Sequence, residues 1–282
     1  MLLAFTGNST IEKNNFVGNY HSIYLSDSVN NTISENSIFG SGRLGDTCRG
    51  IMLWYSSNNS LVANNITTHD WEGIALVKSD NNTIIGNTIT ECWAEGLSLD
   101  GSSNNTISGN NIANNCKGIE LSQSSNNTIS GNNISDNAVW DLGYGIKLST
   151  FSSNNTIIMN NITHNDCGIR LDKSSNNKIY HNNLISNGQQ ANTTTPGYGN
   201  AWDNGYPSGG NYWSGFTDAD QYSGTYQNET GSDGIWDHPY VVDENNIDNY
   251  PLIPEFPSFL ILPLCMATAT LVVILCKRKM CY

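Results

Sequence analysis

The sequence predicts an all-β protein whose main part is a right-handed parallel β-helix of about eight rungs. Three short phrases recur in fixed order, as in residues 104–121 (NNTISGNNIANNCKGIEL): Asn-Asn-Thr-Ile, Asn-x-Ile and Gly-Ile-x-Leu. The apolar residue of the first phrase recurs in steps of 22, 28, 23, 23, 22, 28 and 22 residues, at Ile11, Ile33, Leu61, Ile84, Ile107, Ile129, Ile157 and Ile179. Asn, Ser, Thr and Gly surround each phrase, and these residue types disfavour helices.

The third phrase predicts the strand that carries most of the core. Ile119 and Leu121 are two residues apart, so they share the inward face while Glu120 points outward. The preceding glycine, Gly118 in this rung, allows the backbone to turn into the strand. Leucine-rich repeats share this period, but they need a richer leucine pattern than one Leu and two Ile per rung.

The second phrase predicts a ladder of stacked amides. An Asn stands two residues before the apolar residue of this phrase in every rung, at Asn14, Asn36, Asn64, Asn87, Asn110, Asn132, Asn160 and Asn182. Equivalent residues of successive rungs lie about 4.8 Å apart, so these amides can hydrogen-bond along the axis of the coil. We therefore interpret this ladder as structural.

The repeats occupy residues 1–187, and residues 188–253 form a separate region rich in Gly, Tyr, Trp and Asp. Met1-Leu2-Leu3 matches the end of a Gly-Ile-x-Leu strand, so the chain begins in the middle of a rung. No export signal precedes it, and we expect the natural protein to carry further rungs and a signal peptide upstream. The aromatic residues after residue 187 predict a cap over the last rung.

Connectors of variable length join the second phrase to the third, and a fixed register places them on one side of the coil. They hold three tryptophans and several acids, including Trp71, Trp93, Trp140, Asp70, Glu72 and Glu95. Aromatic rings stack on the apolar faces of sugars, and carboxylates accept hydrogen bonds from sugar hydroxyls. This side is therefore the predicted carbohydrate-binding or adhesive face. Alternatively, the tryptophans only cover the core beneath each turn.

Three charged residues, Glu120, Lys147 and Arg170, take equivalent outward positions on successive rungs. One interpretation is a solvated ladder of ion pairs, which contributes little to stability. The other is a site for an anionic sugar.

Catalysis on a polysaccharide would require two carboxylates within about 5–10 Å of each other, or a calcium cluster beside a basic residue that acts as the base. Asp70 and Glu72 face Glu91 and Glu95 of the next rung in the predicted register, and any acid-rich face would meet this distance. We therefore assign no catalytic residues. A polysaccharide hydrolase, lyase or epimerase stays the alternative.

Charged residues make up only 13% of the chain, and the formal net charge is −13. This balance argues against a nucleic-acid partner and favours an extracellular protein or a cation binder. Oxygen ligands on glycine-rich turns suit calcium, so we assign a calcium site to Asp218, Asp220, Asp233 and Asp237. Turn-forming aspartates are the alternative explanation for these four residues.

The end of the chain predicts a membrane anchor in residues 254–282. Pro254, Glu255 and Phe256 precede an uncharged stretch at 259–276, and Lys277, Arg278 and Lys279 follow it. This stretch is just long enough to cross a bilayer as a single transmembrane helix. The basic cluster predicts a cytoplasmic C-terminus, with the coil outside the cell.

Two parts of the sequence resemble known families. The Asn-rich rungs, followed by WDNGYPSGGNYWS, GSDGI and a closing DNYPL, resemble the NosD-like or CASH-type β-helix surface proteins of archaea. The first name belongs to a periplasmic accessory factor for copper-enzyme maturation, so this resemblance implies the fold more than the function. The tail resembles the PEF-CTERM sorting signal of archaea, which implies processing by an archaeosortase-type enzyme and transfer to a lipid anchor.

The sequence thus predicts a membrane-anchored protein of the cell surface that is non-catalytic and displays a face for cell-envelope glycans. An accessory or metal-handling protein is a further alternative. Asn-x-Ser/Thr triplets begin at Asn30, Asn58, Asn81, Asn104, Asn126 and Asn154, among others. A repeat generates such triplets, and export would make them available for glycosylation.

Overall fold

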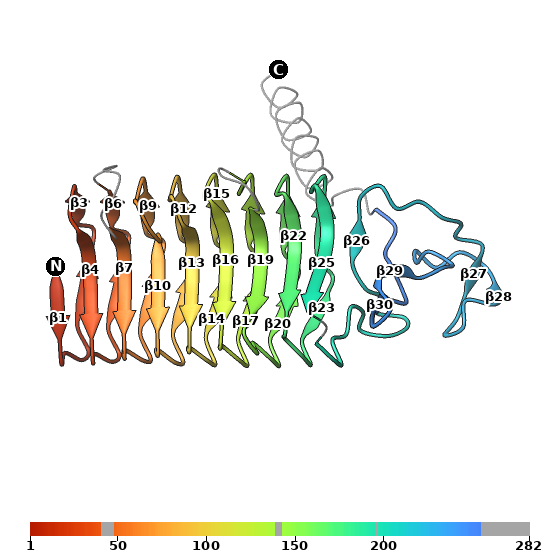
Figure 1. The fold of residues 1–282 in the computed structure, drawn as a ribbon, viewed down its shortest axis with the longest axis horizontal. Helices are drawn as coiled ribbons and strands as arrows, with labels where there is room; N and C mark the ends of the chain where they lie inside the picture. Colours follow the sequence, from red (N-terminus) through yellow and green to blue (C-terminus); the bar gives the residue numbers. More distant parts are fainter. Residues whose placement is uncertain (41–47, 139–142, 196, 255–282) are drawn as a thin grey trace, which may run out of the picture. The chain divides into compact units, whose positions relative to one another are not determined.

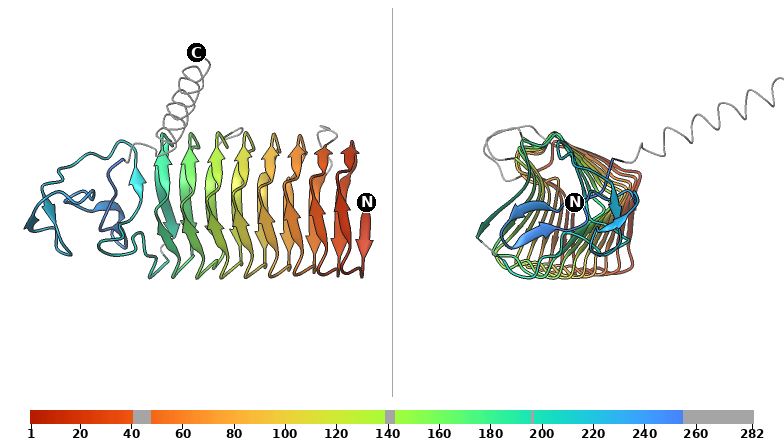
Figure 2. Two further views of the ribbon diagram at one scale, coloured as in Figure 1. Left: turned by 180° about the vertical axis from the view of Figure 1, so that it is seen from behind. Right: turned by 90° about the vertical axis from the view of Figure 1, so that its right-hand side faces the viewer.

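The computed structural model describes residues 1–40, 48–138, 143–195 and 197–254. Three parallel sheets run side by side, and each turn of the chain adds one strand to each sheet (Figure 1). The result is a right-handed parallel β-helix of about eight turns, as the repeats predict. The view along its axis shows successive turns lying over one another (Figure 2).

Sheet 1 contains the Gly-Ile-x-Leu phrases and has the longest strands. Its nine strands are, in spatial order, β1 (Leu2–Ala4), β4 (His21–Ser26), β7 (Arg49–Trp54), β10 (Ile74–Val77), β13 (Glu95–Asp100), β16 (Lys117–Ser122), β19 (Tyr144–Ser149), β22 (Cys167–Asp172) and β25 (Gln189–Thr195).

Sheet 2 contains the Asn-Asn-Thr-Ile phrases in eight strands: β2 (Thr10–Glu12), β5 (Thr32–Ser34), β8 (Ser60–Val62), β11 (Thr83–Ile85), β14 (Thr106–Ser108), β17 (Thr128–Ser130), β20 (Thr156–Ile158) and β23 (Lys178–Tyr180). Sheet 3 contains the second phrases in nine strands: β3 (Asn15–Val17), β6 (Ser37–Phe39), β9 (Asn65–Thr67), β12 (Thr88–Thr90), β15 (Asn111–Ala113), β18 (Asn133–Ser135), β21 (Asn161–Thr163), β24 (Asn183–Ile185) and β26 (Tyr212–Trp213).

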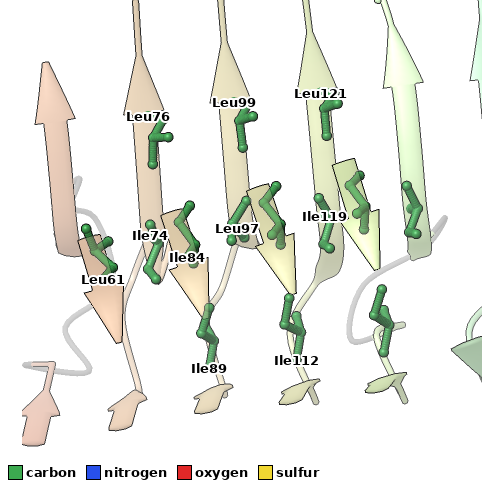
Figure 3. Close-up of a cluster of buried hydrophobic side chains, with 14 of the residues drawn as sticks. Leu61, Ile74, Leu76, Ile84, Ile89, Leu97, Leu99, Ile112, Ile119 and Leu121 are labelled. Carbon is green, nitrogen blue, oxygen red and sulfur yellow. The ribbon is translucent and has the colours of Figure 1, made fainter. Parts of the chain in front are cut away.

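The core consists of columns of aliphatic side chains that stack from rung to rung. Ile119 lies beside Leu97 and Leu121 beside Leu99, and sheets 2 and 3 add one inward residue each per rung. Figure 3 shows these columns in successive rungs. The strand pairing follows the predicted register throughout sheet 2, from Ile11 opposite Ile33 to Ile157 opposite Ile179.

The predicted amide ladder is present along its whole length. Asn110 Nδ2 donates to Asn132 Oδ1 over 2.9 Å, and its Oδ1 accepts from Asn87 Nδ2 over 3.0 Å. The structure adds two ladders that the sequence did not identify, through Asn31, Asn59, Asn82, Asn105, Asn127, Asn155, Asn177 and Asn200, and through Asn115, Asn137, Asn165 and Asn187. Almost all of these asparagines are buried, and the ladders satisfy their polar atoms inside the coil.

Aromatic residues close the C-terminal end of the core. Trp202 and Trp213 are fully buried and join the aliphatic cluster, and Trp213 stacks on Tyr240 with ring centroids 4.0 Å apart. Two hairpins follow: β27 (Tyr222–Ser223) with β28 (Glu229–Thr230), and β29 (Tyr240–Asp243) with β30 (Asn246–Asp248).

Residues 1–252 form one compact unit and residues 253–282 a second. Pro254 is the last described residue, so the predicted membrane span at 259–276 and residues Glu255, Phe256, Lys277, Arg278 and Lys279 lie outside the described part. Within the described part there is no helix with the length and apolar character needed to cross a membrane.

Candidate functional site

Charged side chains gather on the outer face of sheet 1. We call the set Arg49, Glu72, Glu95, Lys117, Glu120, Lys147 and Arg170 the charged strip. Glu120, Lys147 and Arg170 occupy the position between the inward Ile and Leu, and they lie side by side in the strand register. The other four residues stand directly before the glycine that opens the third phrase of their rung.

The glycine explains why the residue before it also belongs to the outer face. A Cβ at Gly96 would lie 2.6 Å from Ile112 Cγ2, so the position of Gly96 faces the interior. The next residue, Leu97, is also buried and faces the interior. Two consecutive inward positions shift the alternation of the strand by one residue. Glu95 and Lys117 are therefore paired neighbours on the outer face.

The middle of the charged strip is a continuous chain of ion pairs. Lys117 Nζ lies 2.6 Å from Glu95 Oε1 and 3.4 Å from Glu120 Oε2. Glu120 Oε1 lies 2.7 Å from Lys147 Nζ, and the Ser149 hydroxyl donates to the same oxygen over 3.3 Å. All four charged side chains are at most one-third exposed, so this chain is better shielded from water than the solvated ladder considered above.

These contacts keep Glu120 and Lys117 in their charged forms. Burial alone would raise the pKa of Glu120, but the hydrogen bond and charge of Lys147, together with Lys117, bring it below its ordinary value. Burial would lower the pKa of Lys117, and the bonds to Glu95 and Glu120 raise it well above its ordinary value instead. Lys117 therefore keeps its proton at neutral pH, and Glu120 stays ionised.

Arg49 and Glu72 form the N-terminal part of the charged strip. Arg49 Nε donates to Glu72 Oε2 over 2.6 Å, and Ser98 Oγ lies 3.5 Å from the other carboxylate oxygen. Burial raises the pKa of Glu72, and the charge and hydrogen bond of Arg49 offset part of that rise. Glu95 on the next rung adds to the rise through charge repulsion.

Arg170 differs from the other cations of the charged strip. Its Nη1 donates to the Tyr144 hydroxyl over 3.0 Å, and its guanidinium carbon lies 5.1 Å from the centre of the Tyr144 ring. Lys147 Nζ lies 5.4 Å from the centre of the same ring. Arg170 belongs to no ion pair among the residues described, and within them its Nε has no hydrogen-bond partner.

Two of the predicted tryptophans lie on the connectors that lead into sheet 1. Trp71 precedes β10 and Trp93 precedes β13, and each side chain is 43% exposed. Backbone hydrogen bonds fix the connectors, from Trp71 N to Cys48 O over 3.1 Å and from Trp93 N to His69 O over 2.9 Å. Trp140 lies outside the described residues.

Two residues of the connector between β9 and β10, His69 and Asp70, lie inside rather than on the face. Asp70 is only 8% exposed, so it is a poor candidate for direct contact with a large ligand. His69 is fully buried, and burial lowers its pKa to about 4. His69 stands two residues after the end of β9. Cys92 and Asn115 stand at the same place after β12 and β15, so His69 occupies the position that Asn115 holds in the third amide ladder.

The four aspartates assigned to calcium each receive hydrogen bonds from neighbouring turns. Asp218 Oδ2 accepts from His238 N, Asp220 Oδ1 from Asp233 N, Asp233 Oδ1 from Ile235 N and Asp237 Oδ1 from Tyr222 N, over 2.9–3.1 Å. These bonds are what turn-forming aspartates make. In residues 1–40, 48–138, 143–195 and 197–254 no three His, Cys, Asp or Glu side chains are grouped so as to hold a metal ion.

The structure therefore brings Glu95, Glu120 and Lys147 into one network through Lys117, pairs Glu72 separately with Arg49, and places Arg170 beside the network. Sequence reasoning missed Arg49, Lys117 and Tyr144, because strict alternation from the Ile of each strand turns the residue before the glycine inward. The signal that could have found them is the glycine itself, which marks the break in alternation.

Comparisons with known proteins agree with this architecture. A family model described as periplasmic copper-binding protein (NosD) matches residues 1–151 and again residues 133–218. No curated protein matches the sequence. Among solved structures, the A-module of mannuronan C-5 epimerase AlgE4 from Azotobacter vinelandii aligns with a TM-score of 0.57 at 17% identity, covering 66% of this chain and 57% of that one.

Two other solved structures are similar. A mutant of the periplasmic alginate epimerase AlgG aligns with a TM-score of 0.55 at 20% identity, covering 67% of this chain and 49% of that one. The DFA-IIIase of Arthrobacter chlorophenolicus A6 without its lid aligns with a TM-score of 0.55 at 16% identity, covering 64% and 49%. At these identities the likeness establishes the fold, and this chain spans only about half of each of those proteins.

Proposed function

The chain belongs to the NosD family, and from that premise we propose that it is a non-catalytic protein of the cell envelope whose charged strip binds an anionic polysaccharide. The observation that carries this proposal is Arg170. It is the cation of the strip that no carboxylate among the described residues neutralises, and a tyrosine ring holds it in place. Guanidinium groups bind carboxylates through paired, charge-assisted hydrogen bonds.

The geometry of the face supports a long ligand. Outward residues of successive strands are spaced about 4.8 Å apart along the coil, so a polymer lying along sheet 1 meets the same row of positions repeatedly. Trp71 and Trp93 flank this row with exposed rings that can stack on sugars. Three of the similar solved structures are enzymes whose names refer to carbohydrates, which is compatible with this choice of ligand.

The state of the carboxylates favours binding over catalysis. A glycosidase-type site needs one carboxyl that is protonated near neutral pH and one that is free to act. Burial raises the pKa of Glu72, but this carboxyl is bonded to Arg49, and both Glu95 and Glu120 are bonded to lysines, so none of the three is free to act. These acids hold the cations in position, and we propose that this is their role.

We propose that the tail anchors the protein at a membrane. The Pro-Glu-Phe triplet, the uncharged stretch and the basic cluster support this. Envelope fractionation followed by mass measurement of the mature C-terminus tests it. Retention of residues 259–276 identifies a plain anchor, and cleavage after the triplet identifies sorting by an archaeosortase-type enzyme.

The proposal is tested by presenting the full chain, in detergent, to an array of neutral and uronate-containing oligosaccharides. We expect signals confined to the uronates, and loss of those signals when Arg170 is replaced by Gln. Incubation with the same polymers, followed by product analysis, should show no cleavage and no change in sugar configuration. Turnover of any polymer would replace the proposal by the enzyme alternative.

Copper handling is the second candidate, because the family description names copper. Cys48, Cys92 and Cys167 are buried, and burial raises the pKa of Cys92 to about 12 and that of Cys167 to about 11. Thiols in this state are weak metal ligands, since the thiolate is the binding form. Copper titration of the full chain, followed by metal analysis, tests this candidate. Copper retained in a stoichiometric amount supports copper handling, and no retained copper rules it out.

A further inference from the structure

We propose that one edge of the coil is an array of acceptor sites for asparagine-linked glycosylation. The turn between sheet 1 and sheet 2 holds an Asn in the left-handed conformation in every rung, with φ between 55° and 58°. We call these residues the turn column: Asn8, Asn30, Asn58, Asn81, Asn104, Asn126, Asn154 and Asn176. All eight are exposed, and successive members are about 4.8 Å apart along the axis.

The side-chain amide of each turn-column Asn stands outside the hydrogen-bonded framework of the described coil. Its backbone N–H is bonded to the next rung in seven of the eight, as from Asn104 N to Ser125 O over 3.1 Å. Its side chain makes no hydrogen bond within the part of the chain that the structure describes. The next residue behaves in the opposite way, since the Asn105 amide is buried and bonded to Asn127.

The backbone conformation alone does not require Asn here. The turn between sheet 2 and sheet 3 also has a left-handed residue in every rung, and there the types vary: Lys13, Glu35, Ala63, Gly86, Gly109, Gly131, Met159 and His181. Left-handed positions in this coil therefore accept many side chains. Uniform Asn with a free amide is confined to the turn column.

A hydroxyl residue follows two positions after the Asn in seven of the eight rungs. These residues begin the strands of sheet 2 and are exposed or partly exposed: Thr10, Thr32, Ser60, Thr83, Thr106, Thr128 and Thr156. No proline stands between, so each triplet meets the requirement for an N-glycosylation acceptor. Lys178 replaces the hydroxyl after Asn176, which gives the column an internal control with the same conformation.

Two acceptor triplets on sheet 3, at Asn133 and Asn161, are less suited. Asn133 and Asn161 lie on the outer face of sheet 3, and their amides are engaged, with Asn133 Nδ2 donating to Asn111 Oδ1 over 2.8 Å and Asn161 Nδ2 to Asn133 Oδ1 over 3.0 Å. A transferase would first have to break these bonds. The turn column offers amides that need no such step.

The reaction requires a polyprenyl-phosphate-linked oligosaccharide as the donor. The Asn amide nitrogen attacks C1 of the reducing-end sugar, the bond from C1 to the phosphate oxygen breaks, and the lipid phosphate leaves while the amide nitrogen releases one proton. Because neighbouring acceptors are about 4.8 Å apart, a glycan on one Asn crowds the next, and we expect partial occupancy. The sugars would border sheet 1 where its strands end and leave its connector side open.

Peptide mapping of the full chain, purified from the cells that naturally make it, tests this proposal by mass spectrometry that keeps the sugar attached. We expect sugar on turn-column residues between Asn30 and Asn154 and none on Asn176. Unmodified turn-column peptides, or sugar confined to sheet 3, would overturn the proposal.

Two variants sharpen the test without disturbing the ladders. Thr106→Val keeps a β-branched residue in β14 and should remove sugar from Asn104 alone, while Lys178→Thr should create a new site at Asn176. Sugar that persists on Asn104 in the first variant would contradict the mechanism. The melting temperature of each variant shows whether the coil is intact.

Discussion

Trp213 donates its indole N–H to the buried carboxylate of Asp248 over 2.8 Å, and this bond joins the last strand of sheet 3 to the β29–β30 hairpin. Asn211 N donates to the same oxygen over 2.7 Å. Trp202 makes the corresponding bond to Asn246 Oδ1 over 3.0 Å. Both indoles that close the core are thus held by side chains of β30, which fixes the cap to the coil.

The cap should be more stable in mild acid than at neutral pH. Burial raises the pKa of Asp248 to about 7 although three N–H groups donate to it. A folded-state pKa above the unfolded value means that stability is highest below about pH 4 and falls as the pH rises toward 7. Denaturant unfolding at pH 5 and pH 8 measures this, with an expected loss on the order of 2 kcal/mol.

Asp248→Asn is the control for that prediction, because the amide does not titrate. The free energy of unfolding of this variant should change less between pH 5 and pH 8 than that of the natural chain, because the titration of Asp248 is removed. Equal slopes in the two proteins would show that the carboxyl is not responsible.

Asn110→Ala should destabilise the coil strongly. The Asn110 side chain accepts from the backbone and the amide of Asn87 and donates to Ile84 O and to Asn132. Its removal leaves buried polar groups without partners at a cost of about 3 kcal/mol or more. Asn183→Ala is a matched control on the exposed side of β24, where the change should stay within about 0.5 kcal/mol. Similar losses in both variants would contradict a structural role for the ladder.

Lys117→Met should lower the free energy of unfolding by about 1–3 kcal/mol, because Glu95 loses the lysine to which it is paired and Glu120 loses one of two. Adding Glu95→Gln should restore part of this loss, since the unpaired charge is then removed. Lys178→Met, at an exposed lysine outside the ion pairs of the described chain, serves as the control and should change little.

Cysteine labelling tests the packing of the connectors. Cys92 is buried and burial raises its pKa to about 12, whereas Cys116 is partly exposed. A thiol-alkylating reagent should modify Cys116 in the native protein and reach Cys92 only after unfolding. Equal rates at the two residues would place the connector of β13 differently from the structure.

Much of the fold could be predicted from the sequence, because every copy of the repeat indicates the same strand register. The alignment of Ile11 with Ile33, and of each later equivalent, is the register of sheet 2. The asparagines of all three amide ladders stand outside strands, where turn-forming Asn is expected anyway, so the sequence did not single out the second and third ladders. The burial of His69 was missed because nothing in a single rung shows that this position faces inward.

The candidate site was predictable only in part. Outward positions between Ile and Leu identified Glu120, Lys147 and Arg170, since strand alternation holds within that phrase. Alternation fails at the glycine, so the sequence did not pair Lys117 with Glu95 or place Tyr144 beneath Arg170. Which side chains pair depends on how far each one extends toward the neighbouring rung. The spacing of residues along the chain does not specify this.

The most direct test of the account is calorimetric titration of the full chain with an oligogalacturonate and an oligomannuronate, beside a neutral glucan of equal length. We expect at least one uronate to bind and the glucan not to bind. Arg170→Gln should weaken uronate binding about tenfold or more, which is the loss of one charge-assisted contact. If neither uronate binds, or if Arg170→Gln binds as tightly as the natural chain, the charged strip is not a site for an anionic polysaccharide.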